Sequence, residues 1–445
     1  MTSLLEKRSP RRTIIAALVA VAVLAIGLIG WRLIPLHAPP SDEQAERFVK
    51  IGLQFQEQSP REPVSFFGPA ALYPAAEDKT TLDALHSQMA MLAQEMEGAS
   101  NPRRARLHER AKRLAALIAL AAGDEKLSFD EEAKRLYGLD PATLDEAKFA
   151  QLRAKLDQLL PGDGSLTSRV QAFRDRYIVP EELRPELFQR ALDECRVRTK
   201  RHWSLPPEEK LYVEWNSYAG AAWHQYQGNF RSSLQINPQA VAFLGSIVDV
   251  ACHEGYPGHH VQFLLREMDF GNGKLPLEEK VVFLRSPGSV VREGAADYGV
   301  SLAFPIEDRL VFERDVLFPL AHFPPEDAEH FEQVRSLLAQ LAPAALPILR
   351  DYRDREIAPA AAIAALDDKA LIGSPQALLG FTDNLGAFVT GYTSVREQVR
   401  AAIEQGNPDE EERWARLRAL LGMADNVPLG VASDRLSVAG TEADD

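Results

Sequence analysis

The sequence predicts a mainly α-helical α+β fold, in which a helical array accompanies one small β-sheet or hairpin. Three observations point to this fold. Apolar residues recur at helical spacing among charged residues through most of the chain. β-Branched and aromatic residues concentrate in one short region, residues 211–237, and the segment after it is apolar around almost its whole circumference. With 445 residues, 46% of them apolar, the chain can bury a sizeable core.

The first forty residues differ in character from the rest. Basic residues between Lys7 and Arg12 precede an uncharged apolar run at residues 13–31. A helix of that length can cross a hydrocarbon core of roughly 30 Å, and the basic cluster would stay in the cytoplasm. We therefore expect residues 1–40 to form a cytoplasmic tail, a signal-anchor transmembrane helix and a linker. The protein would then be single-pass in the inner membrane, with its remainder periplasmic or otherwise extracytoplasmic. A cleaved signal peptide, ending near residues 36–38, is the alternative.

Residues 41–205 are expected to form a helical region. Prolines and glycines separate its segments, because a proline lacks the amide donor that a continuing helix needs. Helices are expected at residues 86–97, 103–122, 144–160 and 181–202.

Residues 206–445 are expected to form a second region. Strands are expected at residues 211–215 and 230–237, and a helix at residues 240–252, whose apolar circumference predicts burial on all sides. Further helices are expected at residues 281–302, 326–349, 379–405 and 410–421.

The acidic composition and the few cysteines limit the function. A formal net charge of -14 argues against nucleic-acid binding, which needs a basic surface. The two cysteines, Cys195 and Cys252, do not make a disulfide framework. Cys252 lies in the apolar segment and is expected to be a small buried hydrophobic residue rather than a nucleophile.

The string HEGYPGHH, residues 253–260, ends the apolar helix and is close to the zinc-protease pattern HExxH. A continuous helix would separate His253 from His260 by about 10 Å, too far for both to bind one ion. Pro257 and Gly258 must therefore kink or stop the helix. We expect a two-residue bulge that brings His259 to the position of the second histidine of HExxH. A helix end whose histidines contact the terminal carbonyls is the alternative.

A third protein ligand is expected further along the chain. Glu293 lies forty positions after His253 in an apolar helical stretch, and Asp297 follows one helical turn later. Asp297 is placed to accept the ring N–H of a ligating histidine and so fix its tautomer. Glu293 is therefore the expected third ligand.

HEGYPGHH followed by REGAADY, residues 292–298, resembles the bacterial family catalogued as domain of unknown function 885, a zincin-like group of metallopeptidases. The resemblance covers roughly residues 205–400 and implies a zincin-like catalytic region within residues 206–445. It implies His253, His259 and Glu293 as metal ligands and Glu254 as the catalytic glutamate. In the family the second histidine of the HH pair varies more, which favours His259, with His260 as the alternative ligand.

Two further features bear on this resemblance. The family usually has a tryptophan where Ala295 stands here, which concerns substrate preference. The spacing of Glu293 and Asp297 is similar to that of gluzincin peptidases.

Two more segments could belong to a catalytic site. GYTSVREQVR, residues 391–400, places Tyr392 and Arg396 on one helical face, where either could stabilise an oxyanion. An amphipathic helix with solvated charges is the alternative. FRSSLQIN, residues 230–237, is either the edge strand along which a peptide aligns or an ordinary hairpin strand.

These features predict a membrane-tethered, zinc-dependent hydrolase that acts on peptide bonds. Glu254 would be the general base for a metal-activated water, Zn²⁺ the cofactor and a peptide the substrate. A non-catalytic zincin-like scaffold or binding protein is the alternative, and it would have no need of Glu254. The peptide cut, the choice between endo- and exopeptidase action, and the oligomeric state are left open.

Overall fold

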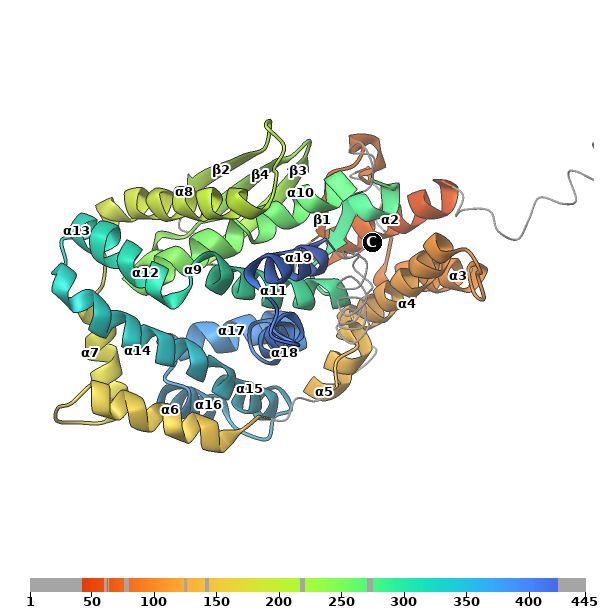
Figure 1. The fold of residues 1–445 in the computed structure, drawn as a ribbon. Helices are drawn as coiled ribbons and strands as arrows, with labels where there is room; N and C mark the ends of the chain where they lie inside the picture. Colours follow the sequence, from red (N-terminus) through yellow and green to blue (C-terminus); the bar gives the residue numbers. More distant parts are fainter. Residues whose placement is uncertain are drawn as a thin grey trace, which may run out of the picture.

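The computed structural model describes residues 42–59, 62, 64–75, 80–123, 126–140, 144–216, 221–269 and 275–422 (Figure 1). Its helices are α2 (Asp42–Gln58), α3 (Leu82–Glu95), α4 (Pro102–Ala122), α5 (Phe129–Glu132), α6 (Glu146–Leu159), α7 (Leu166–Arg176), α8 (Arg184–His202), α9 (Leu244–Glu254), α10 (His259–Asp269), α11 (Pro287–Ala303), α12 (Ile306–Phe312), α13 (Phe318–Leu320), α14 (Ala328–Leu341), α15 (Ala345–Arg353), α16 (Pro359–Lys369), α17 (Pro375–Leu385), α18 (Ser394–Ile403) and α19 (Glu410–Leu421). The strands are β1 (Val64–Phe66), β2 (Lys210–Trp215), β3 (Ala222–Gly228), β4 (Arg231–Ile236) and β5 (Val281–Phe283). A 3₁₀ segment, η9 (Gly386–Tyr392), joins α17 to α18.

The predicted mainly helical fold with one small sheet region is confirmed. Predicted helices correspond closely to α3, α4, α6, α8, α9 and α19. Local signals set their ends, as in α4. There Asn101 caps the backbone N–H groups of Arg103 and Arg104, Pro102 occupies the first turn, and Gly123 ends the helix with a φ of 82°.

Three of the longer predicted helices are interrupted. The segment predicted as a helix from residue 281 begins as strand β5, and α11 starts only at Pro287. Residues 326–349 divide into α14 and α15 around Pro343, and residues 379–405 divide into α17, η9 and α18. Proline and the tight 3₁₀ geometry explain these breaks.

The main sheet has the strand order β2-β4-β3. β4 pairs in parallel with β2, where Val213 is opposite Leu234, and in antiparallel fashion with β3, where His224 is opposite the same residue. Residues 230–237 therefore contain the central strand, and their reading as an edge strand is wrong. β2 and β3 are the two edge strands, and β3 packs against α9 and α10. A separate pair is formed by β1 and β5.

Helix α9 packs against α8 on one side and against α11 on the other (Figure 1). α11 is buried along nearly its whole length, with only Asp297 and Ser301 partly or fully exposed. It packs in turn against α18, α19 and η9. α6 packs against α14, and α2 and α4 pack against α3 at the other end of the molecule. The division of the chain at residue 206 stays a prediction.

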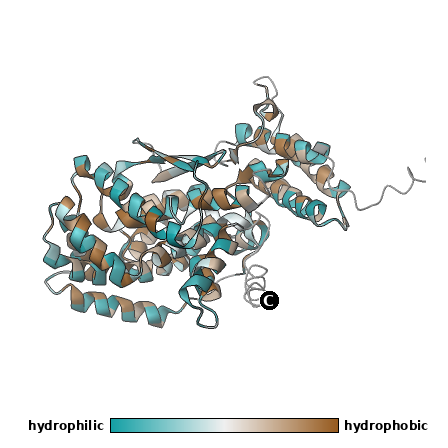
Figure 2. Cartoon of the chain, turned by 45° about the horizontal axis from the view of Figure 1, so that its top comes forward, coloured by the Kyte–Doolittle hydropathy of each residue, from teal (hydrophilic) through white to brown (hydrophobic). Residues whose placement is uncertain are grey.

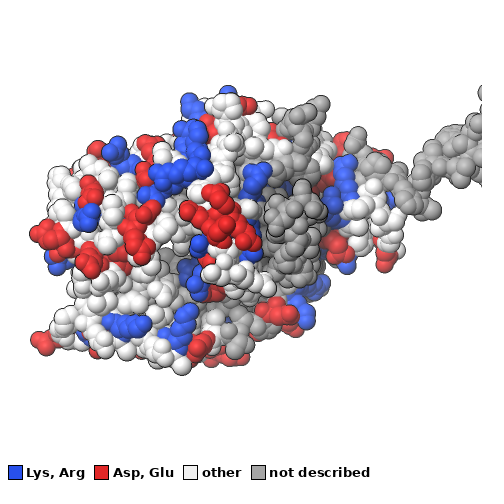
Figure 3. All heavy atoms as spheres, in the orientation of Figure 1, with Lys and Arg blue, Asp and Glu red and all other residues white. Residues whose placement is uncertain are grey.

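Hydrophobic and hydrophilic residues share most of the helices, as expected of helices with one buried face (Figure 2). On the face shown in Figure 3, acidic and basic side chains are interspersed.

The predicted single-pass location in the inner membrane is corrected. Within the residues that the structure describes, no helix is both long and apolar enough to cross a bilayer. The apolar run at residues 13–31 lies outside those residues.

The two cysteines form a disulfide between α8 and α9. Cys252 is fully buried, as predicted, but it is bonded to Cys195 rather than packed as a free thiol. The bond fastens α9 to α8 at the residue that precedes His253. The sequence offered no sign of it, because the two residues are 57 positions apart.

Loss of this disulfide should destabilise the fold. A cross-link across 57 residues restricts the unfolded chain, so the Cys195→Ala/Cys252→Ala variant should lose about 2 to 4 kcal/mol of unfolding free energy. Urea unfolding followed by circular dichroism measures this loss. Reductant should lower the midpoint of the wild type and leave that of the variant unchanged. Equal midpoints for the variant and the oxidised wild type would contradict this role.

Candidate metal centre

The chain reverses direction between α9 and α10. α9 ends at Glu254, Gly255 leaves helical geometry with φ -100° and ψ -93°, and α10 begins at His259. The Tyr256–Pro257 peptide bond is cis. The helix thus stops before Pro257, one of the two outcomes expected there, and a tight turn between two helices takes the place of the expected two-residue bulge.

Gly258 permits this turn. Its N–H donates to the carbonyl oxygen of Cys252 at 3.1 Å. A Cβ atom at this position would lie 1.7 Å from the carbonyl oxygen of His253, so no larger residue fits. The turn places the start of α10 directly beside the end of α9, and His259 beside His253.

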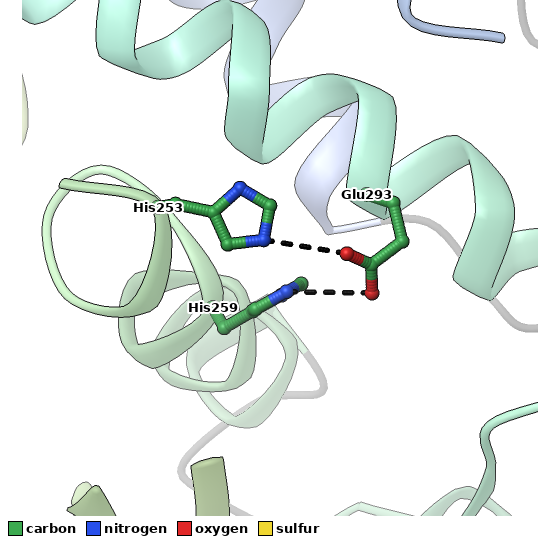
Figure 4. Close-up of side chains that lie close together, drawn as sticks. All are labelled: His253, His259 and Glu293. Carbon is green, nitrogen blue, oxygen red and sulfur yellow. Dashed lines mark ion pairs between the residues drawn. The ribbon is translucent and has the colours of Figure 1, made fainter. Parts of the chain in front are cut away.

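Three side chains converge from two directions (Figure 4). His253 Nε2 lies 3.3 Å from Glu293 Oε2, and His259 Nε2 lies 3.4 Å from Glu293 Oε1. One potential ligand atom from each residue lies within 4.8 Å of the others. The structure thus brings together the three residues that the sequence singled out as ligands.

This arrangement fits a small divalent metal ion. Two ligand atoms at about 2.1 Å from a tetrahedral zinc ion are about 3.4 Å apart. The two histidine–glutamate distances, 3.3 and 3.4 Å, match that separation. Glu293 Oε2 is buried and has no hydrogen-bond partner among the described residues, as expected of an atom that faces an ion.

The other ring nitrogens are held by acceptors. His253 Nδ1 donates to Asp297 Oδ1 at 2.8 Å, and His259 Nδ1 donates to Gln262 Oε1 at 2.9 Å. Each bond leaves Nε2 unprotonated in the neutral ring and directed at the centre. Asp297 therefore has the position expected for it. Gln262 was not singled out in the sequence, although its i+3 spacing from His259 could have indicated it.

The electrostatic field at the centre favours positive charge. Burial alone would lower the pKa of His253, but Asp297 and Glu293 raise it well above its ordinary value. Burial would likewise raise the pKa of Glu293, but the two histidines hold it well below its usual range. The potential that favours protons on the imidazoles would equally favour a divalent cation in their place.

His260 is directed away from this centre. It is fully buried, with Nε2 3.1 Å from Glu209 Oε2 and Nδ1 2.8 Å from Ser232 Oγ. Tyr256 also donates to Glu209 Oε2, at 2.7 Å. A neutral His260 can donate to the carboxylate and accept from the hydroxyl, which uses both nitrogens. The geometry thus favours His259 over His260 as ligand.

Glu254 and Tyr392 lie in the cavity that contains the centre. Glu254 is the last residue of α9 and lines the cavity, and its carboxylate makes no hydrogen bond to another described residue. Burial raises its pKa. The ring of Tyr392 lies 6.1 Å from that of His253. Burial, and then Glu293, raise the pKa of Tyr392 well above its usual value, so the phenol keeps its proton.

Close backbone packing positions Tyr392. A Cβ atom at Gly391 would lie 2.9 Å from Glu293 Cβ, and one at Gly294 would lie 3.0 Å from the backbone of Arg396. η9 and α18 can approach α11 this closely only because both positions are glycine.

Arg396 does not reach the centre. Its Nη2 donates to the carbonyl oxygen of Ala339 at 2.9 Å, and it lies 3.7 Å from Glu397. The structure therefore brings Tyr392, but not Arg396, to the three converging side chains.

His224 is a cavity residue that the sequence did not indicate. It lies on β3, with its ring 6.2 Å from that of His259 and stacked on Phe263 at 5.5 Å. Its Nε2 is buried and has no hydrogen-bond partner among the described residues. No local motif marks it, because strand pairing alone brings it beside the metal centre.

Comparisons with known proteins show that this fold is shared with a solved structure, but they identify no family. No family model and no curated protein matches the chain. The crystal structure of a presumed lipoprotein from Colwellia psychrerythraea is similar, with a TM-score of 0.52 and 15% identity over 82% of this chain. The chain spans 64% of that protein's length. At this identity the similarity shows a shared fold alone.

Two other solved structures are more distant. A presumed lipoprotein of unknown function from Shewanella oneidensis gives a TM-score of 0.44 and 12% identity, over 80% of this chain and 72% of the other. The M32 carboxypeptidase from Deinococcus radiodurans R1 gives a TM-score of 0.43 and 15% identity, over 90% of this chain and 97% of the other. Both TM-scores are too low to support an argument about this protein.

Replacement of either ligating histidine should remove the metal. After zinc loading and dialysis, the wild type should hold close to one zinc per chain by mass spectrometry, and His253→Ala and His259→Ala should hold almost none. His260→Gln is the control, because a glutamine can still donate to Glu209. Zinc loss in His260→Gln, with retention in His259→Ala, would show that the ligand assignment is wrong.

Proposed function

We propose that this protein is a zinc-dependent hydrolase that cleaves peptide bonds. The observation that carries the proposal is the convergence of His253, His259 and Glu293 in one cavity with a carboxylate, Glu254, that makes no hydrogen bond to a described residue. Two imidazoles and one carboxylate form a ligand set typical of hydrolytic zinc sites. Held by these three side chains, zinc would supply a Lewis acid that polarises the substrate carbonyl and lowers the pKa of water.

Glu254 is the proposed general base. It follows a proposed ligand directly in sequence, yet the tight turn after α9 leaves it in the cavity rather than in the ligand set. It can accept the proton of the attacking water and then deliver that proton to the leaving amine. A protein that only bound metal would not need a carboxylate at this position. The presence of Glu254 therefore favours an enzyme over a non-catalytic scaffold.

Tyr392 is the proposed donor to the oxyanion. Its ring lies beside His253 and it lines the cavity, and burial together with the charge of Glu293 keeps its phenol protonated. A phenol there can donate a hydrogen bond to the oxygen that gains negative charge as water attacks the carbonyl. Arg396 has no part in this proposal, because its guanidinium is engaged by the carbonyl of Ala339.

Strand β3 supports a peptide as the substrate. β3 is an edge strand of its sheet, and Ala222, Trp223 and His224 all line the cavity. The edge of a strand offers backbone N–H and C=O groups to an extended chain. A peptide placed along β3 would pass beside His259, which is close to His224.

Glu254→Gln should greatly slow hydrolysis without loss of metal. The substitution keeps the size of the side chain but removes its basicity, so kcat/KM should fall by about 10²- to 10⁴-fold on any peptide that the wild type cleaves. Glu293→Gln should instead lose zinc, because a weak neutral ligand replaces an anionic one.

A peptide-library digest read by mass spectrometry, together with zinc analysis, measures both effects. Glu57→Gln, at an exposed position on α2, is the matched control and should behave as wild type. Undiminished cleavage by Glu254→Gln, or a zinc-loaded wild type that cleaves nothing, would favour the scaffold.

Tyr392→Phe should slow the chemical step. Removal of one oxyanion donor typically lowers kcat by about 10²- to 10³-fold, while KM should change little. Tyr352→Phe is the control, because that hydroxyl bonds Asp383 at the surface. Steady-state kinetics and zinc content of both variants test the assignment, and a Tyr392→Phe enzyme that keeps the wild-type kcat would exclude this role.

A further inference from the structure

The cavity beside the metal centre has two unlike walls. It encloses about 980 Å³. All of its charged lining residues come from α9 and α11, and they are Asp249, Glu254, Arg292, Glu293 and Asp297. The wall formed by α15, α17 and η9 has no charged residue among those described, and its polar residues are Asn384 of α17 and Tyr392 of η9. A bound molecule would thus meet the reactive groups on one side and an apolar surface on the other.

Helix α17 supplies the centre of the apolar wall. Leu378, Phe381 and Leu385 are spaced by three and four residues, which places them on one face of the helix. All three line the cavity and are only partly buried. Leu349 of α15 and Phe388 of η9 also line the cavity and are almost fully buried. Apolar side chains that remain open to water inside a cavity are typical of a ligand site.

The apolar wall begins at the metal centre. The rings of Phe381 and Phe388 lie 5.8 and 6.1 Å from that of Tyr392, and the ring of Tyr392 lies 6.1 Å from that of His253. A substrate carbonyl placed between Tyr392 and Glu254 would therefore have the apolar wall within one side-chain length. The residue that contributes this carbonyl, or its immediate neighbour, would contact the wall.

We propose that the wall formed by Leu378, Phe381, Leu385 and Phe388 is a specificity subsite for a large apolar side chain next to the scissile bond. This inference rests on the proposed function. A leucine or phenylalanine side chain would displace water from the half-open face of α17. A charged side chain would lose much of its hydration there without meeting an opposite charge on the wall.

Binding of small hydroxamates to the zinc-loaded full-length protein tests the subsite without any need for turnover. Acetohydroxamate probes the metal centre alone. The hydroxamates of phenylalanine, leucine, glycine, aspartate and lysine share that group and differ in side chain. Calorimetry should show that the phenylalanine and leucine compounds bind roughly 10²-fold more tightly than the glycine compound, and that the aspartate and lysine compounds gain nothing over glycine.

Leu378→Asp is the decisive variant, because Leu378 is partly exposed and the substitution need not disturb the core. It should weaken the phenylalanine hydroxamate at least about tenfold and leave acetohydroxamate unchanged. Leu378→Met should keep the wild-type preference. Ile306→Asp is the matched control, because Ile306 is 56% exposed on α12 and does not line the cavity.

The outcomes separate the two proposals. Equal affinities across the panel, or a Leu378→Asp protein that keeps the phenylalanine preference, would overturn the subsite while acetohydroxamate binding still supported the metal centre. If acetohydroxamate did not bind to the zinc-loaded wild type, the proposed function would fail, and the subsite with it.

Discussion

The site depends on a carboxylate that is buried on a helix with almost no exposed surface. Glu293 lies in the middle of α11 and is only 5% exposed. An unpaired charge in such a place costs several kcal/mol, so the surrounding elements must supply positive charge. Two imidazoles from α9 and α10 face it, and each is held by a further acceptor. The packing of α9, α10 and η9 around α11 brings this positive charge to Glu293.

The tight turn after α9 is what makes two imidazoles available at one point. On one straight helix, residues 253 and 259 would face different sides. The chain instead stops, folds back onto the carbonyl of His253 at Gly258 and starts a second helix. The disulfide at Cys252 fixes the end of α9 to α8. Glu209 also stabilises the turn, because it accepts hydrogen bonds from His260 and Tyr256. Rigid support on both sides keeps the ligand geometry in place before any ligand binds.

The sequence predicted those parts of the site that local chemistry determines. His253, His259 and Glu293 were found because three histidines and a glutamate end an apolar helix and a second apolar helix contains an acid. Features that depend on contacts between residues far apart in the sequence could not be predicted. β5 was taken for helix because its apolar run has no period of its own, and it becomes a strand by pairing with β1, more than 200 residues earlier. The Ser286 cap and Pro287 were signals for the true start of α11. The disulfide, the cavity position of His224 and the central position of β4 had no local signal at all.

The two adjacent histidines show how burial assigns roles that sequence leaves open. His259 and His260 are neighbours on α10, so their side chains leave the helix about 100° apart. His259 reaches Glu293 in the cavity and is still partly exposed there. His260 reaches Glu209 in a fully buried site. Burial lowers the pKa of His260, which favours a neutral ring with one donor and one acceptor. Ser232 and Glu209 match that pair of groups and leave His260 no lone pair for a metal ion. The HH pair therefore divides into a ligand and a structural residue, and the division follows from which carboxylate each ring can reach.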